Sequence, residues 1–361
     1  VKSGIKYALI KITYNGHCCT LKENLIEYVK TLLNVNEAVI EDGIINLKVN
    51  NEIIIEERDE EEWVYLYSFY NAENQIAERI TKLDKARNVK KVSNIEKELK
   101  LIEERTDILL SEKQKEAIRA INDNNVTIIT GGPGTGKTTI IKSIIEIYKQ
   151  KKYKIVLCAP TGRAAKRMSE TTGEEASTLH RLLEIGKVDE ESLFKKNSEY
   201  KGAPIDGDII IVDEVSMVDM FIMSYLLDCI YQGTKLILVG DSDQLPSVGP
   251  GSVLKDLIAS EKIVTVHLDK IFRQAAKSKI IVNAHRVNNG KRFINKEDPE
   301  LEEDANQDFF FIRETNQEKI LKEVLSLCNG RLKNFGEYDF FENIQVLTPT
   351  KKGLLGTKEL N

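Results

Sequence analysis

The sequence predicts an α/β protein with a parallel β-sheet, preceded by a small α+β module. From residue 106 onward, short runs rich in Ile and Val alternate with amphipathic helical segments, which is the pattern of a parallel sheet covered by helices on both faces. Acidic or glycine-rich segments directly follow several of these runs. Sheets of this kind bind ligands at the carboxyl ends of their strands, so we expect the functional site there.

The first 105 residues predict a winged-helix-like module followed by a helical connector. Residues 21–34 place Leu and Val at helical spacing. Residues 36–57 predict short strands, because Asp42-Gly43 and Asn50-Asn51 interrupt a stretch rich in Ile and Val. Residues 84–105 are highly charged and weakly apolar, and we expect them to form the connector.

The central segment, residues 106–274, predicts the main α/β domain. Its buried strands are expected at residues 125–130, 153–160, 208–214, 234–241 and 263–269. A further unit is expected over residues 275–361, with strands at 308–314 and 343–349 on either side of a helix at 316–328. Two parallel strands cannot bury both of their faces, so we expect this unit to be incomplete.

Composition narrows the class of protein. The 361 residues are 41% hydrophobic, and no apolar stretch approaches the roughly 18–20 residues of a membrane span. The five cysteines form no CxxC pair, and the four histidines show no metal-ligand spacing. These features favour a cytoplasmic protein without a disulfide framework or zinc site. The chain starts without Met and ends inside a predicted helix, so we expect a fragment that is truncated at both ends.

The segment "GGPGTGKT", residues 131–138, matches the phosphate-loop pattern between a strand and a helix. Backbone N–H groups of such a loop surround the phosphates of a nucleotide. Lys137 is expected to reach the β- and γ-phosphates, and the Thr138 hydroxyl to hold Mg²⁺. The predicted phosphate-binding residues are Gly132, Pro133, Gly134, Thr135, Gly136, Lys137, Thr138 and Thr139.

Two acids, Asp213 and Glu214, follow the predicted strand at 208–214. An acid there can bind Mg²⁺ through a water opposite Thr138, and a second acid can deprotonate the attacking water. We assign the metal to Asp213 and the water to Glu214. The alternative is an acid pair that only stabilises the start of a helix. The loop and the acids together predict hydrolysis of a nucleoside triphosphate.

Several further segments occur in a fixed order: "LSEKQKEAI", "APTGRAAKRMSE", "ASTLHRLL", "VDEVSMVD", "VGDSDQLPSVGPG", "LDKIFRQ" and "VLTPTKKGLLGTKELN". With the phosphate loop, they resemble the RecD-like family of superfamily 1 DNA helicases, in particular its longer, free-standing members. The resemblance implies that residues 106–274 are the first of two RecA-like ATPase domains and that residues 275–361 begin the second. It also implies ATP and Mg²⁺ as cofactors and 5′→3′ movement on single-stranded DNA.

The resemblance also assigns roles near the nucleotide. Gln244 in "GDSDQLP" would sense the γ-phosphate or its water, and the alternative is a polar loop residue. Gln114 would hydrogen-bond adenine, but Ser111 and Gln114 also fit a helix capping box. Arg273 lies past the last predicted strand, and a guanidinium there can stabilise charge on the transferring phosphate. The alternative for Arg273 is a surface position.

Residues 147–167 contain seven Lys or Arg and no acid, although the net charge of the chain is −5. A local basic patch of this kind can hold DNA phosphates, and Thr161, Arg163 and Lys166 are the candidates. By the resemblance, Thr178 and His180 would also contact DNA, with a core or capping histidine as the alternative. An insert at about residues 185–206 would form a hairpin that places Phe194 at a duplex junction, or else a plain surface loop.

Three functions compete. The leading one is an ATP-driven DNA helicase acting on single-stranded DNA and duplex junctions, with protein partners not predicted. The second is the helicase part of a conjugative relaxase, which would need a three-histidine cluster, whereas residues 1–105 hold only His17. The third is a non-motor ATP-binding subunit of a nuclease–helicase complex. We expect the isolated chain to be a weak ATPase, because a trans-domain arginine contributes roughly 10³–10⁵ to the rate.

Overall fold

The structure is a computed structural model that describes residues 1–87, 90–185, 202–270, 277–294, 308–332, 334 and 340–361. It divides into two compact units, Val1–Ala276 with Ala284–Lys291, and Lys277–Asn283 with Arg292–Asn361. Among the described helices, none combines the length and apolar character required to cross a membrane.

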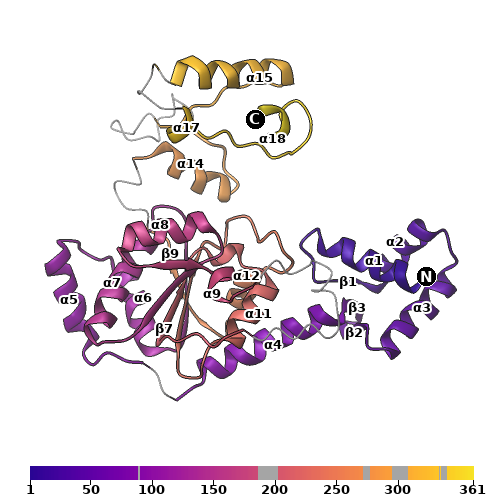
Figure 1. Cartoon of the computed structure of the whole chain (residues 1–361), viewed down its shortest axis with the longest axis horizontal. Coiled ribbons are helices and arrows are strands. Elements are labelled where there is room, and N and C mark those ends of the chain that lie inside the picture. The colour runs from indigo at the N-terminus through magenta and orange to yellow at the C-terminus, as the bar shows by residue number, and fades with distance from the viewer. Residues whose placement is uncertain (88–89, 186–201, 271–276, 295–307, 333, 335–339) are drawn as a thin grey trace. The chain divides into compact units, whose positions relative to one another are not determined.

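The first unit begins with a small module of three helices and a three-stranded antiparallel sheet (Figure 1). Its elements are α1 (Lys2–Thr13), β1 (Cys19–Leu21), α2 (Lys22–Leu33), α3 (Glu37–Val49), β2 (Ile53–Arg58) and β3 (Glu61–Leu66). The strand order is β1-β3-β2. This agrees with the winged-helix-like module predicted from the sequence, and α2 confirms the helix predicted at 21–34.

The expectation of short strands throughout residues 36–57 is wrong, because residues 37–49 form α3 and only Ile53–Arg58 is a strand. Ile40, Ile44 and Leu47 are buried on one face of α3, and this helical spacing outweighs the β-propensity of a segment rich in Ile. Gly43 does not break the chain. A Cβ atom at Gly43 would lie 2.7 Å from Ile5 Cδ1, so the glycine permits close approach of α1 and α3.

Helix α4 (Tyr67–Asp84) connects this module to the central domain by packing against α11 (Met220–Asp228). The rings of Phe69 and Phe221 meet edge to face with centroids 4.9 Å apart. Ser224 donates a hydrogen bond to Gln75 (3.3 Å), and Arg79 forms an ion pair with Asp228. Apolar and polar contacts together hold the module on the central domain.

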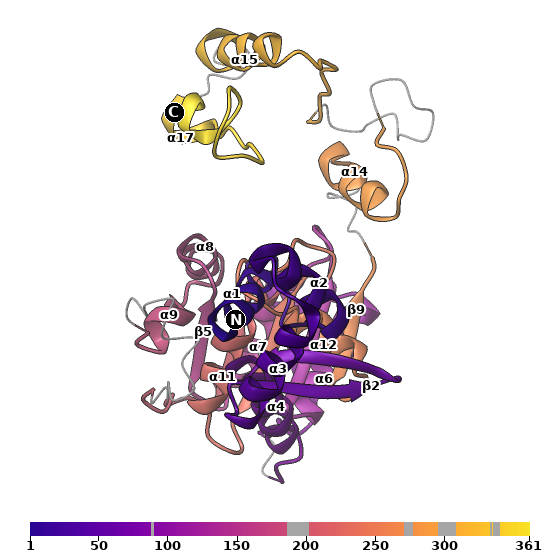
Figure 2. The same cartoon turned by 90° about the vertical axis from the view of Figure 1, so that its right-hand side faces the viewer.

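The central domain contains a six-stranded parallel sheet in the order β6-β5-β7-β8-β4-β9 (Figures 1 and 2). The strands are β4 (Val126–Gly131), β5 (Ile155–Ala159), β6 (Ala176–Thr178), β7 (Ile209–Val212), β8 (Lys235–Gly240) and β9 (Val264–Leu268). The sheet confirms the predicted α/β class. Five of these strands are expected from the sequence. Strand β6 is not, because its three residues are too few to show a clear apolar pattern.

Helices cover both faces of the sheet, as the apolar strands require. Along β7, Ile209 and Ile211 pack into the core beneath α6 and α7, while Ile210 and Val212 pack into the core beneath α4, α11 and α12. The remaining helices of this unit are α5 (Ile95–Thr106), α6 (Glu112–Asp123), α7 (Lys137–Gln150), α8 (Gly162–Thr172), α9 (Leu179–Leu182), η1 (Val215–Met217) and α12 (Val253–Ala259).

The second unit is helical in its described part. Helix α14 (Lys279–Asn288) begins in it, followed by α15 (Gln317–Ser326), η2 (Leu327–Arg331), α17 (Phe340–Asn343) and α18 (Thr357–Leu360). Helix α15 confirms the helix expected at 316–328. The strands expected at 308–314 and 343–349 are wrong, because neither stretch is a strand. A strand requires a ladder of hydrogen bonds to a neighbouring strand, and the described part of this unit contains no strand.

Candidate nucleotide-binding site

The loop between β4 and α7 has the backbone of a phosphate cradle. Gly134 and Gly136 have φ angles of 75° and 84°, a conformation that glycine adopts readily. The Thr135 hydroxyl donates to the Gly132 carbonyl oxygen (2.8 Å). The loop and the first turn of α7 contain all the residues predicted to contact phosphates: Gly132, Pro133, Gly134, Thr135, Gly136, Lys137, Thr138 and Thr139. The first N–H groups of α7 lack intrahelical partners and are available to an anion.

Lys137 is the first residue of α7, and its ammonium lies over this loop. The Nζ atom donates to the carbonyl oxygens of Gly131 and Gly132. Burial lowers the pKa of Lys137, and the nearby carboxylates of Asp241, Glu214 and Asp213 oppose that shift. Lys137 therefore lies within electrostatic reach of three acids that belong to two other strand ends.

Asp213 and Glu214 directly follow β7. The N–H of Asp213 donates to the Cys158 carbonyl oxygen (3.0 Å), which extends the pairing of β7 with β5 by one residue. Asp213 Oδ1 in turn accepts the N–H of Glu214 (2.9 Å). Burial raises the pKa of both carboxyl groups, and for Glu214 the charge of Asp213 raises it further.

Glu214 is held in an unusual conformation. Its φ angle is 54°, in the left-handed region, which is uncommon for residues other than glycine. Its Oε2 atom is buried and has no hydrogen-bond partner. Both features cost free energy, and they are typical of functional sites. The alternative of a simple acid pair at a helix start does not account for the buried, unpaired oxygen.

The loop after β8 carries Gln244 to the same edge. Its first residue, Asp241, is almost fully buried, and its Oδ1 and backbone oxygen accept the N–H groups of Asp243 and Gln244. The Ser216 hydroxyl donates to Gln244 Oε1 (3.5 Å). Since Ser216 is two residues after Glu214, the predicted sensor is connected to the loop that carries the acid pair.

These segments meet because β7, β8 and β4 are adjacent and parallel. Val212 pairs with Leu238, and Gly240 pairs with Thr130, so the three strands end at one edge. A Cβ atom at Gly240 would lie 3.2 Å from Val215 N and 3.3 Å from Ser216 N. The glycine therefore allows the segment after the acid pair to cross close to the end of β8.

Gln114 has the capping geometry and also touches the phosphate loop. Its Oε1 accepts the N–H of Ser111 (2.9 Å), and its own N–H donates to Ser111 Oγ (3.3 Å). Its Nε2 donates to the carbonyl oxygen of Gly136 (3.4 Å). The capping-box alternative is therefore confirmed, and the adenine contact stays a prediction. Gln114 is 2% exposed, so its amide has one fixed orientation.

Two further groups at this edge were not singled out from the sequence. Asp241 is the charge that most strongly opposes the lowered pKa of Lys137. Arg167, on α8, acts in the opposite sense by lowering the pKa values of Asp213 and Glu214. The position of Asp241 directly after an apolar strand was the available signal for it. Arg167 is one of seven basic residues in its segment, and nothing in the spacing separates it from the others.

The predicted DNA contacts lie beside the same edge, on α8 and α9. Thr161 and Thr178 are the N-cap residues of these helices, Arg163 and His180 are exposed, and Lys166 is exposed beside Glu170. The exposure of His180 rules out a core histidine, and Thr178 supplies the cap. Arg273, Phe194 and most of the insert at 185–206 lie outside the described residues, so their roles stay predictions.

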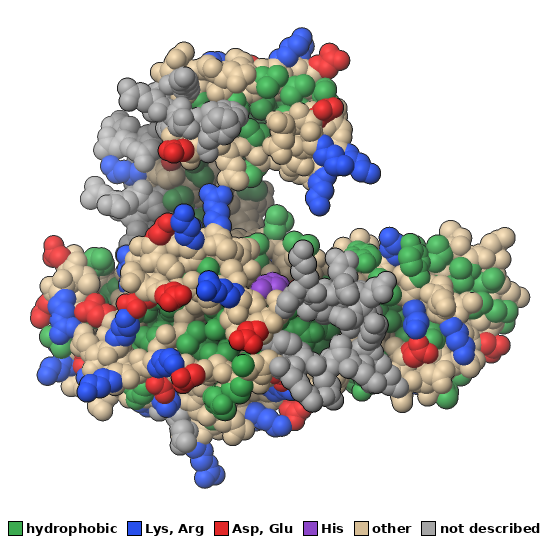
Figure 3. Space-filling view, in the orientation of Figure 1, with side chains coloured by type: hydrophobic (Ala, Val, Ile, Leu, Met, Phe, Trp, Pro, Cys, Tyr) green, Lys and Arg blue, Asp and Glu red, His purple; other side chains and the backbone are tan. Residues whose placement is uncertain are grey.

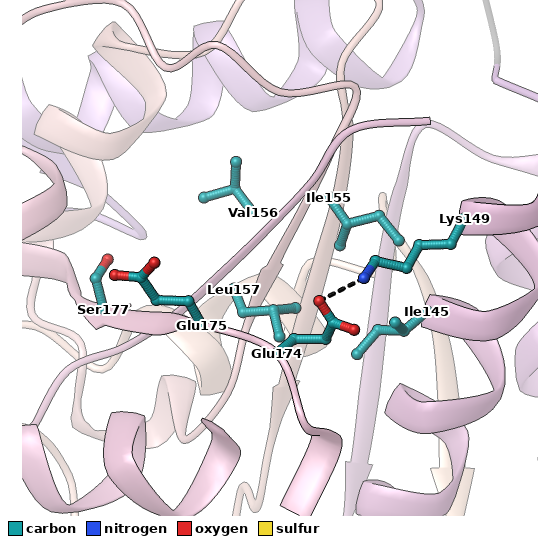
Figure 4. Close-up of a pocket in the computed structure, with 8 residues that line it drawn as sticks. All are labelled: Ile145, Lys149, Ile155, Val156, Leu157, Glu174, Glu175 and Ser177. Carbon is teal, nitrogen blue, oxygen red and sulfur yellow. Dashed lines mark ion pairs between the residues drawn. The ribbon is translucent and has the colours of Figure 1, made fainter. Parts of the chain in front are cut away.

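A separate cavity of about 300 Å³ lies at the other end of the sheet (Figure 4). Its lining includes Ile155 at the start of β5, together with Ile145 and the ion pair between Lys149 and Glu174. Residues of the phosphate loop and the acid pair do not contribute to it. The candidate nucleotide site is therefore the open carboxyl edge of the sheet and not this cavity.

Comparison with known proteins agrees with this geometry. A family model described as an AAA domain matches residues 114–250. The chain is 36% identical over 258 residues to the ATP-dependent RecD2 DNA helicase of Deinococcus radiodurans, covering 70% of this chain and 32% of that protein. It is 29% identical over 359 residues to the RecBCD enzyme subunit RecD of Buchnera aphidicola, covering 82% of this chain and 58% of the relative.

A third relative is the RecBCD enzyme subunit RecD of Mycolicibacterium smegmatis, which is 37% identical over 170 residues, 41% of this chain and 30% of that protein. The chain thus spans less than two thirds of the length of each of these three relatives.

Proposed function

We propose that this chain, which belongs to the RecD-like helicases of superfamily 1, is the ATP-hydrolysing motor of a cytoplasmic DNA helicase. The observation that carries the proposal is the meeting of the phosphate loop, the Asp213–Glu214 pair and the Gln244 loop at the ends of three adjacent strands. A buried, unpaired Glu214 oxygen within this arrangement supports hydrolysis and not only nucleotide binding. Residues 106–274 are then the first ATPase domain.

ATP would bind with its phosphates on the N–H groups of residues 132 and 134–138. Lys137, which now bonds to carbonyl oxygens of its own loop, would turn to the β- and γ-phosphates. The Thr138 hydroxyl and Asp213 would hold Mg²⁺, which prefers oxygen ligands. The chain fits this group, because the carboxylates near Lys137 oppose the lowering of its pKa by burial. Asp213 follows β7, which is two strands from β4 at the same edge of the sheet.

Glu214 is the candidate general base. The pKa of its carboxyl group is raised by burial and by Asp213, which makes the carboxylate a stronger acceptor for the proton of the attacking water. Asp213 and the N–H of Glu214 are fixed to one another by a hydrogen bond. A general base of this kind contributes about 10²–10⁴ to the rate.

Gln244 is the candidate sensor of the γ-phosphate. Its amide can donate and accept hydrogen bonds without a change of charge, and it already accepts a bond from Ser216. Thr161, Arg163, Lys166, Thr178 and His180 are the proposed contacts to single-stranded DNA. The family resemblance adds four further parts to the proposal. Arg273 would stabilise charge on the transferring phosphate, Phe194 would lie at a duplex junction, and Gln114 would contact adenine. Movement on DNA would be 5′→3′.

A second candidate is an ATP-binding subunit that does not act as a motor within a nuclease–helicase complex. Two of the relatives are named as RecBCD subunits, which supports this alternative. The two candidates differ in turnover, because a binding subunit does not need Glu214 to accept a proton. The strained conformation of Glu214 and its unpaired oxygen favour the motor.

The test measures ATP affinity, ATP turnover and strand displacement for the protein and for Lys137→Ala. The motor hypothesis predicts slow turnover by the isolated chain that rises with single-stranded DNA. It predicts displacement of a strand from duplexes with a 5′ tail once the second ATPase domain is complete. Lys137→Ala should lose nucleotide binding or turnover. Tight ATP binding without any DNA-stimulated turnover would reject the motor in favour of the binding subunit.

A further inference from the structure

The exposed face of α1 carries two tyrosines with a lysine between them. Tyr7, Lys11 and Tyr14 are spaced by four and three residues, and Tyr14 continues the helical backbone with a φ angle of −66°, so the three side chains share one face. The tyrosines are 47% and 58% exposed. The Lys11 ammonium lies 5.4 Å from the centre of the Tyr7 ring and 5.5 Å from that of Tyr14. We call these three residues the α1 stripe.

The α1 stripe differs from the rest of its module in charge. Helix α1 contains three lysines and no acid, whereas α3 contains three acids and one lysine. The hairpin of β2 and β3 contains six acids and one arginine at residues 56–62. A nucleic-acid backbone is repelled by the acidic helix and hairpin and attracted by α1. Figure 3 shows hydrophobic side chains at the surface of this module.

The stripe ends next to the loop that carries Gln244. The N–H of Gly251, the last residue of that loop, donates to the Gly16 carbonyl oxygen (3.1 Å), two residues after Tyr14. The approach is close, because a Cβ atom at Gly251 would lie 3.4 Å from Cys18 Sγ. In Figure 1 the C-terminal end of α1 faces the central domain. Leu245 and Val248 of the same loop are exposed, so the loop presents apolar side chains to solvent.

We propose that the α1 stripe is a stacking platform for single-stranded DNA that extends past the ATPase domain. Bases stack on exposed aromatic rings without sequence preference, and a neighbouring cation strengthens the site. The interval from Tyr7 to Tyr14 spans about 10 Å of helix, at 1.5 Å per residue. This length accommodates roughly three nucleotides at a base spacing of about 3.4 Å. The platform rests on the proposed function, because it lengthens the DNA path of that motor.

The test compares the affinity of the protein for labelled oligothymidylates of about 8 and about 25 nucleotides, because only the longer strand can leave the ATPase domain and reach α1. Tyr7→Ala combined with Tyr14→Ala is expected to weaken binding of the long strand by about ten- to a hundredfold and to leave the short strand unchanged. Tyr7→Phe with Tyr14→Phe retains the rings and should retain the affinity.

Tyr28→Ala is the matched control, since Tyr28 is 44% exposed on α2 of the same module and lies outside the stripe. Lys11→Ala should reduce the slope of log affinity against log salt by about 0.7 for the long strand. Long-strand affinity that is unchanged in the double alanine variant, or reduced equally by Tyr28→Ala, overturns the platform alone. Failure of the unmodified protein to bind either strand overturns the platform together with the proposed motor.

Discussion

The replacement of Glu214 by glutamine is expected to stop ATP turnover and, at neutral pH, to stabilise the fold. In the folded protein Glu214 Oε2 is buried without a hydrogen-bond partner, and burial raises the pKa of the carboxyl group. A neutral amide of nearly the same shape requires less solvation than a carboxylate. The side chain is therefore retained at a cost in stability, which is typical of a group needed for chemistry.

The magnitude follows from the unpaired oxygen. An unsatisfied buried polar atom costs about 1–3 kcal/mol and a charged one costs more, so the neutral amide removes the additional cost of the charge. Because Glu214 is only half-buried and Lys137 and Arg167 partly compensate its charge, we expect the lower end, about 1 kcal/mol. For a domain of this size that corresponds to a rise in Tm of about 2–4 °C. Turnover should fall by about 10²–10⁴-fold, while ATP affinity is preserved.

The effect should depend on pH. A folded-state pKa above the unfolded value means that the folded protein binds more protons between the two values, so stability falls as pH rises through the folded pKa. The advantage of Glu214→Gln should therefore be present at neutral pH and vanish below the ordinary pKa of 4.5, where the native side chain is itself neutral. Calorimetry across pH, combined with turnover and nucleotide-affinity measurements, provides the assay.

Glu261→Gln is the matched control, since Glu261 also has a positive φ angle of 53° but is exposed. Its Tm should not change. A Glu214→Gln variant that loses stability at neutral pH, or that keeps its turnover, would refute the assignment of this carboxylate as a strained base.

Three further substitutions test other parts of the site. Gln114→Ala and Ser111→Ala should each lower the free energy of unfolding by about 1 kcal/mol, because both remove part of the helix cap. Only Gln114→Ala should weaken the affinity for ATP relative to that for GTP. Equal effects of the two variants on this nucleotide preference would contradict adenine recognition by Gln114. Gly240→Ala should lower the free energy of unfolding by about 1–3 kcal/mol. Its Cβ atom would lie 3.0 Å from Leu254 Cδ2 and 3.2 Å from Val215 N. The control Gly162→Ala should be tolerated, because a Cβ atom there meets no atom within 4 Å. Arg167→Ala should weaken binding of Mg²⁺–ATP a few-fold in titrations, through lost positive charge beside Asp213 and Glu214, and unchanged affinity would contradict that role.

The site could be predicted from the sequence because strand ends carry its chemistry. Two local patterns predicted its position: a glycine-rich loop before a helix and an acid pair after an apolar run. They place Lys137 and Asp213 beyond the carboxyl ends of two different strands. The topology then required those ends to lie at one edge of the sheet. The adjacency of β7, β8 and β4 confirms the arrangement that these rules predicted.

The sequence failed where a side chain or segment depends on a distant partner. Residues 37–49 were expected to be strands because the segment is rich in Ile and contains a glycine. In the structure, packing against α1 at Gly43 stabilises a helix there. Arg167 acts through charges on another strand end, and no spacing within its own segment reveals that. In the second unit, apolar stretches expected to be strands have no neighbouring strand to pair with among the described residues, so local propensity alone did not decide their conformation.

In the proposed motor, the same connections would link the nucleotide site to the N-terminal module. Gln244 is tied to Ser216, two residues from the acid pair, and its loop ends in the hydrogen bond from Gly251 to Gly16. A change in the partners of Gln244 would therefore act on one short loop that is anchored near both ends, by Ser216 beside the acid pair and by Gly16 after α1. Because Gly251 has a φ angle of 96° and little room for a Cβ atom, a movement of the loop cannot be absorbed by loose packing there. In the proposed motor, the N-terminal module would therefore respond to movement of this loop.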